Sequence, residues 1–80
     1  MNLRIGALYK VEFIDEFAET MYYMFNALSP KNEIVTIYKI ETTGHPIPVV
    51  YYTSLSTGRD DWNTADIFND TFAEIVNEQN

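Results

Sequence analysis

Hydrophobic and polar residues alternate along residues 6–14, and this period of two predicts a strand. From residue 16 onward the apolar residues instead recur at helical spacing. We therefore expect a helix over 16–28, with Asp15 as its N-terminal cap and Ser29-Pro30 as its end. The apolar stripe expected to face the core comprises Phe17, Met21, Met24, Phe25 and Leu28.

β-branched and aromatic residues dominate the middle of the chain and predict two further strands, over 33–42 and 47–54. A turn at 43–46, which contains glycine and proline, separates them. Residues 59–63 are expected to add a short extended piece around Trp62.

A last helix is predicted over 65–77, with Asn63 or Thr64 as its cap. The resulting order, strand–helix–strand–strand–helix, indicates an α+β domain over 1–80, in which two helices cover one face of a small antiparallel sheet. An SH3-like barrel with helical additions is the alternative. The apolar stripe of the last helix comprises Phe68, Phe72, Ile75 and Val76.

The composition supports a folded domain. The chain has 80 residues, enough for one domain, and 46% of them are hydrophobic and 15% aromatic, which argues against disorder despite a net charge of −7. The absence of cysteine excludes disulfides and thiolate chemistry and favours the cytoplasm. No apolar run approaches the ~18 residues of a membrane span, so we expect a soluble protein without a membrane partner.

Negative charge is the informative feature of the sequence. Twelve acidic residues stand against five basic ones, which disfavours direct binding of nucleic acid and favours a basic protein partner. On the predicted last helix, Asp66, Asp70, Glu74 and Glu78 are spaced by four residues and form a row opposite the apolar stripe. Like charges at this spacing destabilise a helix, so helix stability does not explain the row.

Other residues extend this candidate binding face. Two acids precede the last helix, two lie on the first helix, and an isoleucine lies among the acids. Two tyrosines are expected on the polar side of the first helix, where tyrosine commonly contacts proteins. The alternative interpretation is a solvated acidic face without a partner, with the two tyrosines packed against the sheet or a loop. The predicted partner-binding residues are Glu16, Glu19, Tyr22, Tyr23, Asp60, Asp61, Asp66, Ile67, Asp70, Glu74 and Glu78.

The chain shows no recognisable catalytic machinery, so we expect no enzyme, metal or cofactor. His45 is the single histidine and lies in a predicted turn, without a second ligand or base placed by sequence. The serines lack a nucleophile motif and the isolated glycines form no phosphate loop. A small enzyme or ligand binder centred on His45 and Trp62 is a third hypothesis, which requires a pocket.

Segments 49–52, 56–58 and 61–63, with Phe68 and Phe72, resemble the C-terminal half of many small phage and prophage proteins. In those, a strand, a glycine turn and a short helix close a compact domain. The size and acidity also resemble phage-encoded inhibitors that mimic DNA. The resemblance implies binding to a basic host protein, either a nucleic-acid enzyme or a defence factor, in the host cytoplasm. The alternative is an accessory protein that self-associates through a strand edge or through the Tyr22/Tyr23 face.

Overall fold

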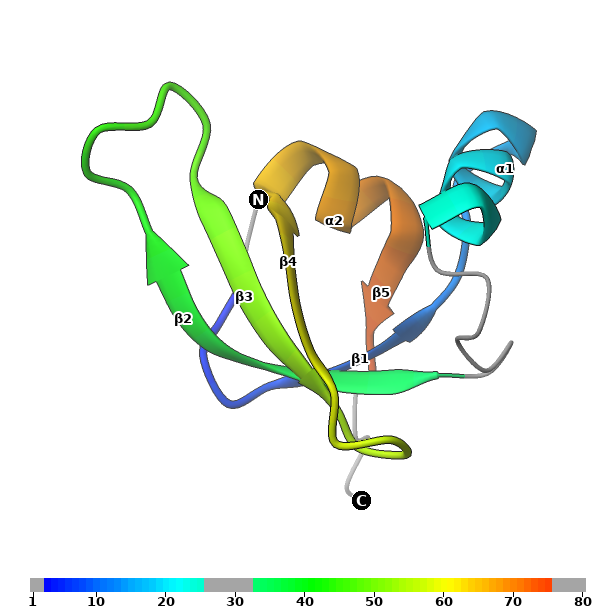
Figure 1. The fold of residues 1–80 in the computed structure, drawn as a ribbon, viewed down its shortest axis with the longest axis horizontal. Coiled ribbons are helices and arrows are strands. Elements are labelled where there is room, and N and C mark those ends of the chain that lie inside the picture. Colours follow the sequence, from blue (N-terminus) through cyan, green and yellow to red (C-terminus); the bar gives the residue numbers. More distant parts are fainter. Residues whose placement is uncertain (1–2, 26–32, 76–80) are drawn as a thin grey trace, which may run out of the picture.

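A computed structural model of the chain describes residues 3–25 and 33–75, which form one antiparallel sheet and two helices (Figure 1). The strands lie in the order β4-β3-β2-β1-β5, so β4 and β5 are the two edges of the sheet. The predicted α+β class is therefore confirmed. The elements are β1 (Leu8–Val11), α1 (Glu16–Phe25), β2 (Ile34–Glu41), β3 (Val49–Ser54), β4 (Asp60–Thr64), α2 (Ala65–Thr71) and β5 (Phe72–Glu74).

The first four strands largely follow the sequence pattern. β2 and β3 lie within the two predicted segments, and the short extended piece around Trp62 is β4, which pairs along its whole length with β3. β1 is shorter than the strand expected over 6–14. The backbone beyond it still contacts α2, because Glu12 N–H donates to the Thr71 carbonyl at 2.8 Å and Ile14 N–H to the Asp70 carbonyl at 3.0 Å.

The prediction of where the last helix ends is wrong. The helix expected over 65–77 ends at Thr71, and Phe72–Glu74 form a strand that pairs with β1. Phe72 has extended backbone angles (φ −123°, ψ 145°), while its N–H still donates to the Phe68 carbonyl. The spacing of the two phenylalanines fits a helix, but the backbone of 72–74 forms ladder hydrogen bonds with the edge of β1 instead. The order of elements therefore differs from the predicted one by an added strand at each end of the sheet.

The sheet curves around α2. Figure 1 shows β2 and β3 bending beneath this helix, with α1 standing beside it. The pairing of β2 with β3 shifts register between Ile37 and Lys39, and such a bulge bends and twists the strands that carry it. The curvature gives the short helix a concave surface against which its apolar side can pack.

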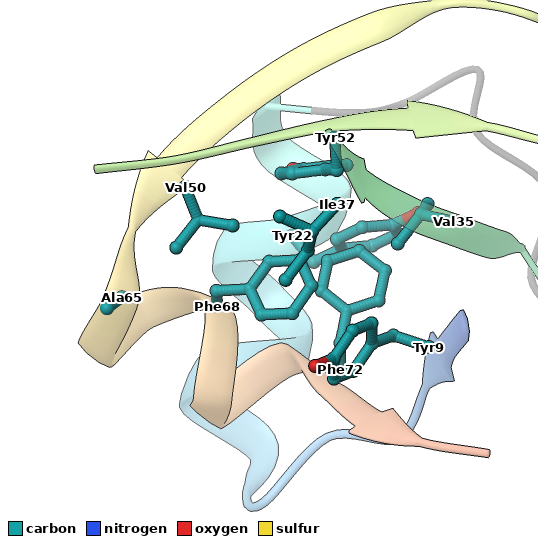
Figure 2. Packing of buried hydrophobic residues seen from close by; sticks show 9 residues of the cluster. All are labelled: Tyr9, Tyr22, Val35, Ile37, Val50, Tyr52, Ala65, Phe68 and Phe72. Carbon is teal, nitrogen blue, oxygen red and sulfur yellow. The ribbon is translucent and has the colours of Figure 1, made fainter. Parts of the chain in front are cut away.

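Aromatic rings fill the space between α2 and the sheet (Figure 2). The rings of Phe68 and Phe72 stack with centroids 4.6 Å apart. Tyr9 meets Phe68 edge-on at 5.2 Å, and Tyr52 meets Phe72 at 5.4 Å. The two phenylalanines of the predicted stripe are thus core residues, although only Phe68 lies on the helix.

The face of α1 that packs on the core differs from the predicted one. Phe17 and Met24 of the expected apolar stripe are exposed, whereas Ala18 and Tyr22 are buried. The hydroxyl of Tyr22 donates to the buried carboxyl group of Glu33 at 2.5 Å, and its ring lies 6.2 Å from that of Phe72. The expectation that Tyr22 faces solvent is therefore wrong. Its ring packs against the core, and the Glu33 carboxyl group accepts the hydrogen bond that its hydroxyl would otherwise lose on burial.

The start of α1 is as predicted. Asp15 Oδ1 accepts a hydrogen bond from the Ala18 N–H at 2.9 Å, which is the interaction of an N-terminal cap. The predicted end of the helix, at 26–30, lies outside the described residues. Thr64 occupies the capping position of α2, but its side chain makes no capping hydrogen bond.

Candidate partner-binding groove

A groove of about 230 Å³ separates α1 from α2, which lie next to each other beside the sheet. We call it the α1–α2 groove. Its apolar walls are Phe17 and Met21 on the α1 side and Ile67 on the α2 side. Asp15 and Asp70 contribute a carboxylate from each side.

A backbone hydrogen bond joins the two sides of the groove, and a side-chain hydrogen bond lies within its α2 side. The Ile14 N–H donates to the Asp70 carbonyl, so the residue before the Asp15 cap is tied to α2. On α2 itself, Thr71 Oγ1 donates to the Ile67 carbonyl at 2.9 Å. Buried Tyr22 and Thr71 are also part of the groove lining. The groove is thus fixed by the packing of the core beneath it.

Large apolar side chains line this groove without being buried. Phe17 is 72% exposed and Ile67 is 50% exposed. A contiguous exposed apolar surface with polar residues at its rim is typical of an interaction site. The prediction that Ile67 lies off the core is confirmed, and its neighbour across the groove is Phe17.

The charged side chains that line the groove in the described part of the chain, Asp15 and Asp70, are both acidic. Among residues 3–25 and 33–75, no lysine, arginine or histidine lines it. Three further acids on the two helices, Glu16, Glu19 and Asp66, are exposed. Hydrogen bonds from the Thr64 hydroxyl and the Ile67 N–H hold the pKa of Asp66 below its usual value, so this carboxylate is ionised at neutral pH.

The prediction of four carboxylates in a row on the last helix is wrong, because α2 ends at Thr71, before Glu74. Asp66 and Asp70 are exposed on α2, but Glu74 lies on β5 and forms an ion pair with Arg4. Because Arg4 and Glu74 are far apart in the sequence, the sequence pattern did not predict this ion pair. Glu78 lies outside the described residues.

The remaining predicted residues are distributed over other surfaces. Asp60 lies on β4, where its carboxylate accepts a hydrogen bond from Thr53 Oγ1 at 2.7 Å. Asp61 pairs with Tyr52 across β3 and β4 and is half-buried. Tyr23 is half-buried, with its ring 5.8 Å from that of Phe13.

Burial is the main reason why the pKa of Tyr52 lies above its usual value, and the charge of Asp61 adds to this effect. Asn63 Nδ2 donates to the Tyr52 hydroxyl oxygen at 2.9 Å. The phenol is therefore a neutral structural group at physiological pH.

His45 and Trp62 do not form a common site. His45 Nε2 lies 3.6 Å from Glu41 Oε1 in the connection between β2 and β3. The sequence favours Trp62 as a core aromatic or one that covers a sheet edge, and the structure places it on the edge strand β4, paired with Tyr51 and 58% exposed rather than in the core. Neither residue lines the groove.

Within residues 3–25 and 33–75, no three His, Cys, Asp or Glu side chains are grouped so that they could hold a metal ion. Neither helix in this part of the chain has the length and apolar character needed to cross a membrane.

Comparison of the chain with protein-family models, with curated proteins and with solved structures gave no match.

The residues that were predicted to bind a partner and that line the groove are Tyr22 on α1 and Ile67 and Asp70 on α2. Phe17 and Met21 were instead assigned to the core and Asp15 only to a cap. No sequence signal distinguishes Phe17 from a core residue, because the acids one and two positions before it lie on other faces of a helix. The burial of Tyr22 then decides which face of α1 turns outward.

Proposed function

We propose that this protein is a non-enzymatic, acidic binding module that engages a basic surface of another protein through the α1–α2 groove. The observation that supports this function is the apolar wall formed by exposed Phe17 and Ile67 with Met21, beside which the charged groups of the described lining residues are carboxylates. Apolar contact supplies affinity at such a surface, while charge supplies orientation and a fast encounter.

The resemblance to phage-encoded inhibitors suggests the kind of partner. A host enzyme or defence factor that binds nucleic acid presents a basic surface, and an acidic chain with a net charge of −7 is attracted to it. Occupation of that surface inhibits the partner by excluding its nucleic acid. In this proposal the mimicry of DNA rests on the acids around the groove rather than on one helical row.

Charge reversal on α2 tests this function. Immobilised full-length chain is incubated with bacterial lysate at low and at high salt, and retained proteins are identified by mass spectrometry. We expect a basic protein whose retention falls steeply with salt, because screening weakens charge attraction. The double variant Asp66→Lys/Asp70→Lys should lose this protein, since both carboxylates lie on the exposed side of α2.

The matched control is Glu41→Lys/Asp60→Lys, which changes the net charge equally but lies on β2 and β4. It should retain the partner. Equal loss from both double variants would show that net charge alone causes retention, and retention by Asp66→Lys/Asp70→Lys would overturn the proposal.

The finer architecture is also part of the proposal. A short helix connects β4 to β5, and β5 returns to pair with β1. Together with the β2-β3-β4 meander and the curvature of the sheet, this arrangement supports an SH3-like barrel with α1 as an addition between the first two strands.

Self-association is the second candidate function, and the outer face of the sheet favours it. Trp62 is exposed on the edge strand β4 and lies across from Tyr51, whose ring is 6.3 Å from that of exposed Tyr38. Edge strands and exposed aromatic residues are both common contact surfaces. A salt-insensitive dimer in sedimentation, abolished by Trp62→Ser, is its expected result.

A further inference from the structure

We infer that the occupant of the α1–α2 groove is an amphipathic basic segment of the partner, which inserts one apolar side chain between Phe17, Met21 and Ile67 and places lysine or arginine beside Asp15 and Asp70. This inference rests on the proposed function and specifies how the partner is recognised.

The size of the groove indicates a side chain rather than a small-molecule ligand. Its volume is about 230 Å³, which is below the roughly 300–1,000 Å³ of pockets that enclose a drug-sized ligand. A groove of this size accommodates an anchoring side chain, with the remainder of the segment lying across the two helices. Insertion of an apolar side chain between helices is a common mode of peptide recognition.

The charge of the groove selects the polar part of the segment. Asp15 and Asp70 stand on opposite sides, and the described residues of α1 and α2 contain no basic side chain. An acidic segment would bring like charges together at both walls, whereas a basic one pairs with them. An uncharged apolar ligand would form no ion pair with Asp15 or Asp70.

The walls are exposed before binding and the backbone beneath them is fixed. Phe17 and Ile67 are both at least half exposed, and Asp15 makes its capping hydrogen bond to Ala18 with Oδ1. A partner therefore covers apolar surface without first displacing a side chain from the core. Sites of this kind bind with little reorganisation cost.

Three synthetic helical peptides and the ¹⁵N-labelled full-length chain test the inference. The first peptide carries leucine at helical spacing and lysine elsewhere, the second has serine in place of leucine, and the third has glutamate in place of lysine. We expect the leucine–lysine peptide to shift the amide signals of Phe17, Met21 and Ile67. The serine–lysine peptide should bind on the order of tenfold more weakly, because it lacks the apolar anchor, and the leucine–glutamate peptide should not bind.

Single variants locate the binding site of the leucine–lysine peptide. Ile67→Ser and Phe17→Ser should each weaken its binding on the order of tenfold, since each removes part of an apolar wall. Leu55→Ser is the matched control, because Leu55 is 57% exposed but lies between β3 and β4, outside the groove lining. Asp70→Asn should weaken binding and Asp60→Asn should not. Far-UV circular dichroism verifies that each variant is folded.

The outcomes separate this inference from the proposed function. If the lysate partner is lost on reversal of Asp66 and Asp70 but is retained by both serine variants of the groove, the function stands and the inference fails. Equal binding of the two lysine peptides also overturns the inference. A dimer that Ile67→Ser abolishes assigns the groove to a second copy of the chain and overturns it as well. Absence of any salt-dependent partner, with no binding of either lysine peptide, overturns both.

Discussion

Tyrosine hydroxyl groups inside the core each have a polar partner. Tyr22 donates to Glu33, the Tyr52 oxygen accepts from Asn63, and the Tyr9 oxygen accepts from the Arg4 backbone N–H at 2.9 Å. Buried hydroxyl groups without partners are costly, so these contacts permit a small domain to use tyrosine as a core residue. The Tyr22–Glu33 contact also joins α1 to the start of β2.

Tyr22→Phe is expected to destabilise the protein by about 1–3 kcal/mol, because the Glu33 carboxyl group loses a buried hydrogen-bond donor. Urea unfolding followed by circular dichroism measures the change. Tyr38→Phe is the control, since Tyr38 is exposed and should leave the midpoint unchanged. Equal midpoints for the wild type and Tyr22→Phe would show that the contact does not stabilise the fold.

Alkaline pH is expected to destabilise the protein through Tyr52. Burial raises the pKa of Tyr52 in the folded state, so the unfolded chain releases this proton first. Its contribution to stability is complete below about pH 10, the pKa of an unperturbed tyrosine, and falls above it by up to about 1.4 kcal/mol per pH unit. Unfolding free energies measured on both sides of this pH should decline less steeply for Tyr52→Phe. Identical slopes would contradict the assignment to Tyr52.

At the scale of elements, the orientation of α1 produces the candidate site. The helix has large apolar side chains on more than one side, so its periodicity alone does not select the buried face. Packing of Ala18 and Tyr22 against the core turns Phe17 outward toward α2. The same choice converts a predicted core residue into a wall of the groove.

Matched leucine substitutions on α1 test this orientation. Phe17→Leu should change the free energy of unfolding by no more than about 0.5 kcal/mol, because Phe17 is exposed. Tyr22→Leu should cost about 1–3 kcal/mol or more through loss of packing and of the hydrogen bond to Glu33. Chemical denaturation of both variants provides the comparison. A larger loss of unfolding free energy for Phe17→Leu than for Tyr22→Leu would instead support the buried face that the sequence pattern predicts.

For the whole molecule, the distribution of charge matters more than its total. Of the acids in the last part of the chain, Glu74 is paired with Arg4, while Asp66 and Asp70 remain on the exposed side of α2. Asp70 lines the α1–α2 groove together with Asp15, the N-terminal cap of α1. The exposed acids lie on both α1 and α2 rather than in the single row that the sequence predicted for the last helix.

The sequence by itself determined the α+β class, the positions of β2, β3 and β4, the Asp15 cap, the core roles of Phe68 and Phe72 and the exposure of Ile67. These features depend on local periodicity and on capping chemistry, which act within a few residues. Tertiary structure alone decided that residues 72–74 form a strand, that Glu74 pairs with Arg4, and which face of α1 is buried. Each of these depends on a partner far away in the chain, β1, Arg4 or the buried Glu33, and no local pattern encodes such contacts.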